Sequence, residues 1–168
     1  PEGAREIVLQ FQFLNPTAED QGRVAVTEEM MNLQFETVSF YPAGHYVRRI
    51  PVQATVTWPE GWTAFTALRG EKKGAAVRYE TTDYETLIDS PVFAGLHAKS
   101  IDLGKGVTLN MVADTPSELA ATPEQIAAHQ RLVNEAFALF ASRHFDHYDF
   151  LFAITGKMGD IGIEHHRS

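Results

Sequence analysis

The sequence contains no cysteine, no long apolar run and no cluster of basic residues. The absence of cysteine excludes disulfide bonds, thiolate metal sites and cysteine nucleophiles, although it does not fix the cellular compartment. No apolar run approaches the ~20 residues that a transmembrane helix needs, and no basic-then-apolar leader opens the chain. We therefore expect a soluble protein, cytoplasmic or periplasmic, and the sequence does not decide between the two.

The charge balance excludes two further classes of partner. Lysine and arginine together number 14 against 22 aspartate and glutamate residues, so the formal net charge is −8. A chain without a basic face neither neutralises nucleic-acid phosphates nor docks on an anionic membrane, and we expect neither partner. A hydrophobic content of 44% and a charged content of 21% are typical of a folded globular protein. A length of 168 residues suits one ordinary domain, or one small domain plus part of another.

Familiar catalytic and metal-binding motifs are also missing. The sequence has no H-E-x-x-H, no G-x-S-x-G and no glycine-rich phosphate loop. Among the seven histidines, His144 and His147 are three residues apart, a spacing that permits chelation only within a continuing helix. We favour solvated or helix-capping roles for this pair. His165 and His166 are adjacent on an expected strand, so their side chains should point to opposite faces and not share a metal. We predict no metal site in this chain.

What the sequence does contain is period-two alternation of apolar and polar residues in three segments, 5–14, 49–58 and 107–114. Such alternation predicts half-buried antiparallel strands, and turn signals rich in proline and glycine separate them. The inward-facing residues would be Ile7, Leu9, Phe11 and Phe13; Ile50, Val52, Ala54, Val56 and Trp58; and Val107, Leu109 and Met111.

After residue 115 the pattern changes to that of a helix between strands. Thr122, Pro123 and Gln125 form the sequence of a capping box at the start of a helix over 123–142. Its apolar face is expected to comprise Ile126, Val133, Phe137 and Phe140. The continuous apolar run "YDFLFAIT" predicts a strand over 148–155 that is covered on both faces, and "IGIEHH" predicts a last strand over 161–166.

We therefore predict an α+β, mostly β chain. An antiparallel, β-sandwich-like domain would occupy residues 1–115, and residues 116–168 would be the start of a second, incomplete domain. One helix and two strands rarely form an independently stable domain, so the sequence predicts that the chain ends partway through one. An open sheet edge there would also favour self-association.

One carboxylate in the last predicted strand stands out. Glu164 follows small and apolar residues, and the strand places Gly162 on its face. A glycine there lets another backbone approach closely, which suits a peptide laid along a sheet edge with its terminal ammonium against Glu164. The alternative is a glutamate on the solvent side of an edge strand.

From Phe35 to Ser168 the sequence resembles the glycyl aminopeptidase family of zinc metallopeptidases, which belongs to the thermolysin-like clan. The resemblance is carried by "SFYPAGHYVRRIPVQATVTWPEGW", "DYETLIDSPVFAG" and "HFDHYDFLFAITGKMGDIGIEHHRS". It implies an N-terminal β domain followed by a thermolysin-like catalytic domain, of which residues 116–168 would be the truncated first lobe. It further implies a preference for small N-terminal residues such as glycine or alanine.

The resemblance also implies roles for four residues of the last predicted strand. The segment is similar to the G-x-M-E-N strand of related zinc aminopeptidases, in which the glutamate binds the free amine of the substrate. Glu164 would take that role, with Gly162 and Ile163 pairing with the substrate backbone. His165 stands where the related motif has asparagine. The family's zinc ligands and general base would lie beyond residue 168, so we expect no zinc in this chain and no activity from it alone; its partners would be a peptide and the remainder of its own catalytic domain.

A different class of function stays open at this point. An acidic β-sandwich could serve as a non-catalytic binding module for a peptide, a glycan or a partner domain. Tyr41, Tyr46, Trp58 and Trp62 flank turns and could line such a surface. Aromatic residues in strands, however, are more typical of a protein core.

Overall fold

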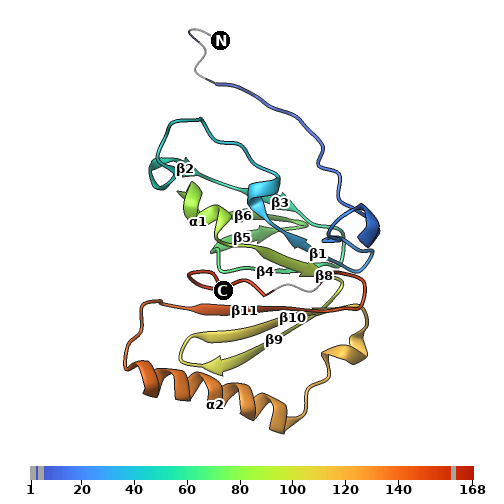
Figure 1. The fold of residues 1–168 in the computed structure, drawn as a ribbon, viewed down its shortest axis with the longest axis vertical. Helices are drawn as coiled ribbons and strands as arrows, with labels where there is room; N and C mark the ends of the chain where they lie inside the picture. Colours follow the sequence, from blue (N-terminus) through green and yellow to red (C-terminus); the bar gives the residue numbers. More distant parts are fainter. Residues whose placement is uncertain (1–2, 4–5, 160–161) are drawn as a thin grey trace.

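The computed structural model describes residues 3, 6–159 and 162–168 and is mostly β (Figure 1). The two α-helices are α1 (Tyr84–Ile88) and α2 (Pro123–Phe140). Short 3₁₀ helices occur at Glu19–Gln21, Phe35–Thr37, Val47–Arg49 and Pro116–Leu119. The strands are β1 (Met30–Leu33), β2 (Pro51–Val52), β3 (Thr55–Thr57), β4 (Thr63–Phe65), β5 (Gly70–Lys73), β6 (Ala76–Tyr79), β7 (Thr82–Asp83), β8 (Val92–Gly95), β9 (His97–Gly104), β10 (Val107–Ala113) and β11 (Tyr148–Ile154).

The N-terminal unit is built from three small antiparallel sheets. Their strand orders are β1-β8-β4, β3-β6-β5 and β2-β7. Trp58, Tyr79 and Val92, together with Tyr84 and Leu87 of α1, form a buried core between them. The expectation of a β-rich N-terminal domain is therefore confirmed.

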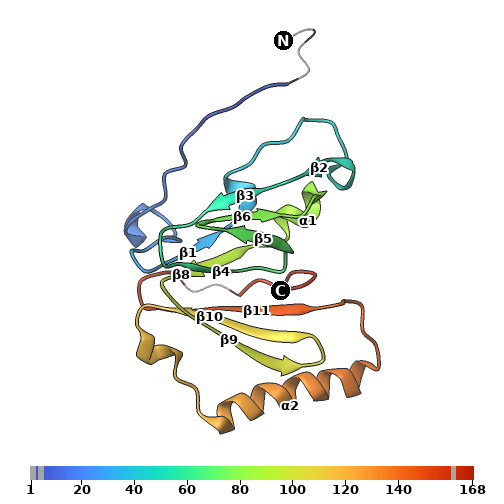
Figure 2. The same ribbon diagram turned by 180° about the vertical axis from the view of Figure 1, so that it is seen from behind.

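The C-terminal layer is a three-stranded sheet of order β11-β10-β9 with α2 on one face. β9 and β10 are antiparallel, whereas β11 runs parallel to β10, and α2 supplies the crossover that parallel neighbours require. Val133 and Phe137 of α2 pack against Leu103, Val107 and Leu109 of this sheet. In both views the sheet lies between α2 and the N-terminal unit (Figures 1 and 2).

A third apolar cluster joins the unit and the layer. Met30 and Val112 are fully buried there, beside Val24 and Met158. Met30 begins β1, Val112 lies in β10 and Met158 follows β11, so the interface ties the end of the chain to the first strand. Burial of these side chains fixes the C-terminal segment beside the N-terminal unit.

The period-two patterns give different outcomes. Residues 50–58 turn the predicted face toward the core, with Trp58 buried and the other four side chains half-buried, although they form two short strands, β2 and β3, rather than one. Val107, Leu109 and Met111 are also buried as predicted. The predicted strand at residues 5–14 is wrong: residues 6–14 form no strand, and Ile7, Leu9 and Phe11 are exposed. No neighbouring strand covers them, so alternation alone does not produce a sheet.

The predicted helix is confirmed, with a correction at its end. Thr122 caps α2, its side chain accepts the N–H of Gln125, and the side chain of Gln125 accepts the N–H of Thr122. The helix ends at Phe140 rather than at residue 142, because Ala141 takes a left-handed conformation. Phe140 is 71% exposed and therefore does not contribute to the core.

The two strands predicted after the helix need larger corrections. The strand predicted over 148–155 is present as β11, but it is an edge strand, and Phe152 is 42% exposed. The prediction that both faces of this strand are covered is therefore wrong. Residues 162–166 form no strand, and Ile161 of the predicted range lies outside the described residues.

The domain boundary predicted near residue 115 stays a prediction. β9 and β10 precede it and share one sheet with β11, which follows it. Across the described ranges 3, 6–159 and 162–168, no helix combines the length and the apolar character needed to cross a membrane.

Candidate functional site

A cleft of about 380 Å³ separates β11 from the C-terminal segment and from the sheet that contains β8. A volume of this size lies within the range of small-ligand sites, ~300–1,000 Å³. Its apolar walls include Phe93, Tyr148, Phe150, Phe152 and Met158. Gly162, Ile163, Glu164 and His165 all line it as well. The structure thus brings the four predicted substrate-binding residues together, and their role stays a prediction.

Glu164 is exposed on the wall of this cleft. Partial burial raises the pKa of the Tyr148 phenol, and the negative charge of Glu164 raises it further. The carboxylate and the phenol therefore lie close enough to interact electrostatically. Among the residues that the structure describes, none forms an ion pair with Glu164, which leaves its carboxylate available to a cation in the cleft.

The two histidines that follow Glu164 share one acceptor, the carboxylate of Asp89. His165 Nδ1 lies 3.1 Å from Asp89 Oδ1, and His166 Nδ1 lies 2.7 Å from Oδ2. The backbone N–H of His166 also donates to Oδ2, at 3.1 Å. The prediction that these rings face opposite sides is wrong, because the segment is not a strand and its side chains do not alternate.

One backbone contact holds the end of the chain against β11, and a second closes the end of the chain on itself. The N–H of Asp149 donates to the carbonyl of Arg167 at 2.7 Å, and the N–H of His165 donates to the carbonyl of Ser168 at 2.8 Å. The Arg167 guanidinium lies 3.6 Å from Asp146, an exposed pairing of small energetic value. The segment 162–168, called the tail below, is thus attached through His165, His166 and Arg167.

His147 lies in a partly buried polar network rather than in solvent, so the predicted solvated or capping role is wrong for this residue. Its Nε2 donates to the carbonyl of Ala67 in the N-terminal unit at 2.9 Å. Nδ1 lies 3.1 Å from Asp146 without forming a regular hydrogen bond. α2 ends seven residues earlier, at Phe140, so the helical spacing that chelation by His144 and His147 needs is absent.

Asp149 extends this network into the sheet. Asn110 donates to its carboxylate at 2.8 Å, and Ser100 donates to Asn110 at 2.8 Å. Burial raises the pKa of Asp149, although the hydrogen bond from Asn110 and the charge of His147 oppose the shift. These contacts fix the start of β11, where Tyr148 lines the cleft.

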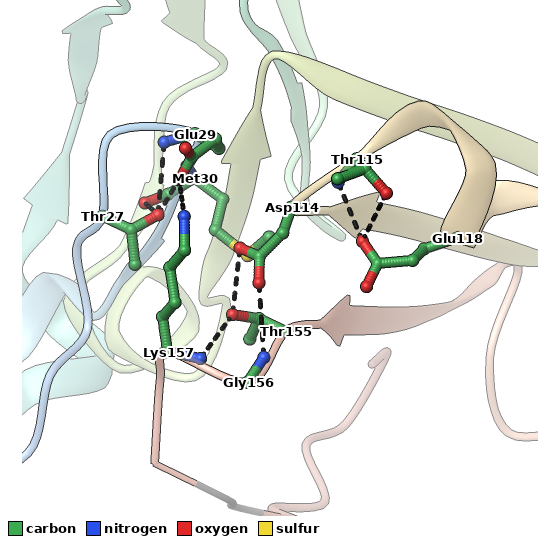
Figure 3. A network of polar contacts seen from close by, with 9 residues as sticks. All are labelled: Thr27, Glu29, Met30, Asp114, Thr115, Glu118, Thr155, Gly156 and Lys157. Carbon is green, nitrogen blue, oxygen red and sulfur yellow. Dashed lines mark hydrogen bonds and ion pairs between the residues drawn. The ribbon is translucent and has the colours of Figure 1, made fainter.

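A second polar network holds the turn after β11 (Figure 3). Thr155 and the N–H of Gly156 donate to the carboxylate of Asp114, at 3.1 and 3.3 Å. Lys157 pairs with Glu29 at 2.8 Å, and its hydrogen bond lowers the pKa of Glu29. The turn is therefore tied to the end of β10 and to the start of β1, and it directs the chain back along the cleft.

An apolar groove of about 580 Å³ lies on the other side of the sheet, along the C-terminal half of α2. Its lining includes Val107, Leu132, Phe137, Phe140, Phe145 and Phe150. Leu132, Leu139 and Phe140 are 55%, 78% and 71% exposed. The layer formed by α2 and β9–β11 thus presents an apolar surface that no other described part of the chain covers.

The alternative aromatic surface is not formed as predicted. Trp58 and Trp62 are buried in the core of the N-terminal unit, at 5% and 9% exposure. Tyr41 and Tyr46 are exposed, at 50% and 58%. Within the described part of the chain, no three histidine, aspartate or glutamate side chains gather where they could hold a metal ion.

Sequence comparison identifies the family of the N-terminal unit. The model of the Peptidase M61 N-terminal domain matches residues 1–96, more than half of the chain. The chain belongs to the Peptidase M61 N-terminal domain family. The resemblance to a peptidase is confirmed at this level, and the M61 match ends at the start of the C-terminal layer. A search of curated proteins finds no match.

A structural neighbour extends the likeness beyond the M61 domain. The crystal structure of an aminopeptidase N family protein from Idiomarina loihiensis superposes with a TM-score of 0.63 at 19% sequence identity. The match covers 83% of this chain but 24% of that protein. At this identity the likeness concerns the fold, and the chain spans about a quarter of the neighbour's length.

Asp89, Tyr148 and Asp149 were not predicted as parts of the site. Asp89 lies in "DSPVFAG", one of the segments that carry the family resemblance, but 75 residues separate it from Glu164. Tyr148 and Asp149 lie in a run that reads as an ordinary apolar strand. Nothing local in the sequence marks these three residues as parts of the site, because their proximity to Glu164 depends on the tertiary fold.

Proposed function

We propose that this chain is the N-terminal portion of a zinc-dependent aminopeptidase that removes small residues, glycine or alanine, from the N-terminus of peptides. The observation that supports it most is the Glu164 carboxylate on the wall of the cleft, in a chain of the Peptidase M61 N-terminal domain family. In this proposal Glu164 binds the free ammonium group of the substrate. An ammonium–carboxylate contact is a strong, charge-assisted hydrogen bond.

The surroundings of Glu164 suit an extended peptide. A Cβ atom at Gly162 would meet nothing within 4 Å, so a substrate backbone can approach there. Among the described residues, Gly162, Ile163 and Glu164 form no strand pairing, and their peptide groups are available to an added strand. The preference for glycine and alanine rests on the family resemblance, and the modest volume of the cleft agrees with it.

The described residues do not offer a set of zinc ligands, as stated above. We propose that the metal and the general base belong to polypeptide outside these 168 residues, and that the isolated chain is inactive. When bound, zinc would supply Lewis-acid activation of water. The contribution of the present chain would be to bind and orient the amine end of the substrate.

The same proposal assigns an occupant to the apolar groove beside α2. The remainder of the catalytic domain would pack there and against the free edge of β11, because α2 and β11 leave apolar side chains exposed. An exposed apolar face next to the open edge of a sheet is a surface that folded proteins normally cover. Without that remainder, the same edge would favour self-association.

Peptide hydrolysis by the full-length protein tests the proposal. We expect cleavage of glycyl or alanyl peptides with a free amine and little cleavage of their N-acetylated forms. Glu164→Gln, which keeps the shape but removes the charge, should lower kcat/KM for the free peptides about 100-fold, because the substrate ammonium loses its charged partner in the cleft.

Glu71→Gln on the exposed strand β5 is the matched control and should leave the rate unchanged. Equal cleavage of acetylated and free peptides, or an unchanged rate in Glu164→Gln, would contradict the role of Glu164. Full activity without bound zinc would contradict the metallopeptidase part of the proposal.

A further inference from the structure

The Asp89 carboxylate receives three contacts from the two residues after Glu164. Both oxygens are used: His165 Nδ1 meets Oδ1, while the ring and the backbone N–H of His166 meet Oδ2. An ionised carboxylate only accepts hydrogen bonds, so the hydrogen on each imidazole must lie on Nδ1. One side chain thus sets both the position and the tautomer of two consecutive histidines.

Asp89 itself is held firmly by α1. Its N–H donates to the carbonyl of Glu85 at 2.9 Å, and the side chain of Ser90 donates to the carbonyl of Thr86 at 2.8 Å. Tyr84 and Leu87 of the same helix are buried in the core of the N-terminal unit. Burial acts to raise the pKa of Asp89, but its contacts with His166 and His165 outweigh that effect and lower it.

The fixed tautomer has a consequence for the cleft. With its hydrogen on Nδ1, a neutral His165 ring carries a lone pair on Nε2, and no described residue is hydrogen-bonded to that atom. His165 lines the cleft beside Glu164. A primary ammonium has three N–H donors, so it can bond to the Glu164 carboxylate and to a second acceptor at the same time.

We propose that Asp89 is a positioning residue that holds the tail through His165 and His166, so that Glu164 and Nε2 of His165 together accept the substrate's ammonium group. This inference rests on the proposed aminopeptidase function. It gives "DSPVFAG" and "IEHH", which lie far apart in the sequence, a common role. Asp89 acts through the two histidines rather than by contact with the substrate.

Asp89→Asn in the full-length protein is the test. Asparagine has the same shape but offers one carbonyl oxygen and one NH₂ group, and the NH₂ group cannot accept from an imidazole N–H. We expect KM for a glycyl peptide to rise about tenfold with a small change in kcat, since a displaced binding group weakens substrate positioning. ¹⁵N NMR of the imidazole rings should show the Nδ1–H form of His165 in the wild type and its loss in the variant.

Asp83→Asn is the matched control, because Asp83 caps the other end of α1 through Thr86 alone and asparagine is an equally good cap. It should leave both KM and the His165 tautomer unchanged, and thermal melts of the two variants separate loss of positioning from loss of folding. A wild-type KM in Asp89→Asn would overturn the inference, and an unchanged His165 spectrum would show that Asp89 does not set the tautomer.

The two proposals fail in different ways. If the wild-type protein does not prefer free over acetylated peptides, the aminopeptidase proposal and the amine-binding role of His165 both fall. If the preference exists and Asp89→Asn retains the wild-type KM, the positioning role of Asp89 alone is refuted.

Discussion

Residues 50–58 and residues 6–14 differ in what lies beside them. Both segments alternate apolar and polar side chains, and both were predicted to be strands. β3 pairs with β6, and the face of residues 50–58 enters the core that contains Trp58. Residues 6–14 have no paired neighbour, and the chain runs alone along one side of the molecule (Figures 1 and 2). A strand therefore needs a partner as well as a pattern.

The tail is a third case between these two. It carries the alternation "IGIEHH" and, like residues 6–14, it forms no strand in its described part. Unlike them it is fixed, because Asp89 and Asp149 bind its side chains and backbone. Polar contacts to distant residues thus hold a segment that sheet pairing does not, and they leave the backbone of Gly162–Glu164 free for a ligand.

The largest expected effect on stability concerns residues 50–58, which pack against the core. Trp58→Ala should lower the free energy of unfolding by about 3–5 kcal/mol, because it leaves a large cavity in a core where Trp58 is 5% exposed. Urea unfolding followed by circular dichroism measures the change. A loss below about 1 kcal/mol would mean that residues 50–58 are no better covered than residues 6–14.

A smaller effect distinguishes a covered glycine from an uncovered one. A Cβ atom at Gly95 would lie 3.0 Å from the Glu29 carbonyl and 3.2 Å from Val112. Gly95→Ala should therefore cost about 1–3 kcal/mol of stability through overpacking.

Gly162→Ala is the paired variant, with nothing within 4 Å of the added methyl group. It should change stability by no more than about 0.5 kcal/mol, yet lower peptide cleavage by the full-length protein if a substrate backbone lies there. Equal losses of stability in the two variants would show that the tail is packed as tightly as β8.

Substitutions in residues 6–14, which are exposed, should change the stability of the protein only slightly. Phe11 is 49% exposed and contacts Phe40 with ring centroids 4.8 Å apart. Phe11→Ala should cost about 0.5 kcal/mol or less, since both rings stay largely in water. A loss comparable to that of Trp58→Ala would show that residues 6–14 are covered in solution.

The smallest expected effect is the release of the tail from Asp89 at low pH. Contacts with His166 and His165 of the docked tail hold the pKa of Asp89 below its ordinary value of 3.8, so the Asp89 carboxylate binds protons less readily when the tail is docked than when it is free. The stabilisation is thus fully present above the ordinary pKa and is lost as the pH falls through the lowered one. Protonation of the histidines at Nε2 keeps the Nδ1–H donors, so it does not by itself release the tail.

Hydrogen exchange of residues 162–168, corrected for its intrinsic pH dependence, should therefore rise only below about pH 4 in the wild type. In Asp89→Asn it should be raised at every pH. Release of the wild-type tail near pH 6 would contradict the assignment to Asp89.

Much of the local structure was predictable from sequence. The capping box of Thr122 and Gln125, the buried face of β10 and the inward residues of 50–58 depend on interactions within a few residues or on a strong periodic pattern. The errors at residues 6–14, at 162–166 and on the faces of β11 have a common cause. In each case the apolar pattern shows which side chains could be buried. Whether they are buried depends on other segments of the chain that pack against them.

The candidate site was predictable only in part. Glu164 was distinguished by its apolar surroundings, by Gly162 and by the family resemblance, and the structure places it on a cleft. The expectation that His165 and His166 diverge was wrong, because it assumed strand geometry. Asp89 could not be found from local sequence, since a carboxylate at the end of a short helix is common and carries no signal of its distant partners.

The sequence by itself determined the β-rich composition, the position and start of α2, the family of the N-terminal unit and the candidate Glu164. These follow from periodicity, capping and motifs, which act over short distances along the chain. Only the tertiary structure decided that β11 lies at a sheet edge, that residues 6–14 stay uncovered and that Asp89 holds both histidines. Those features depend on which distant segments meet, and a hydrogen bond across 76 residues leaves no periodic trace in the sequence.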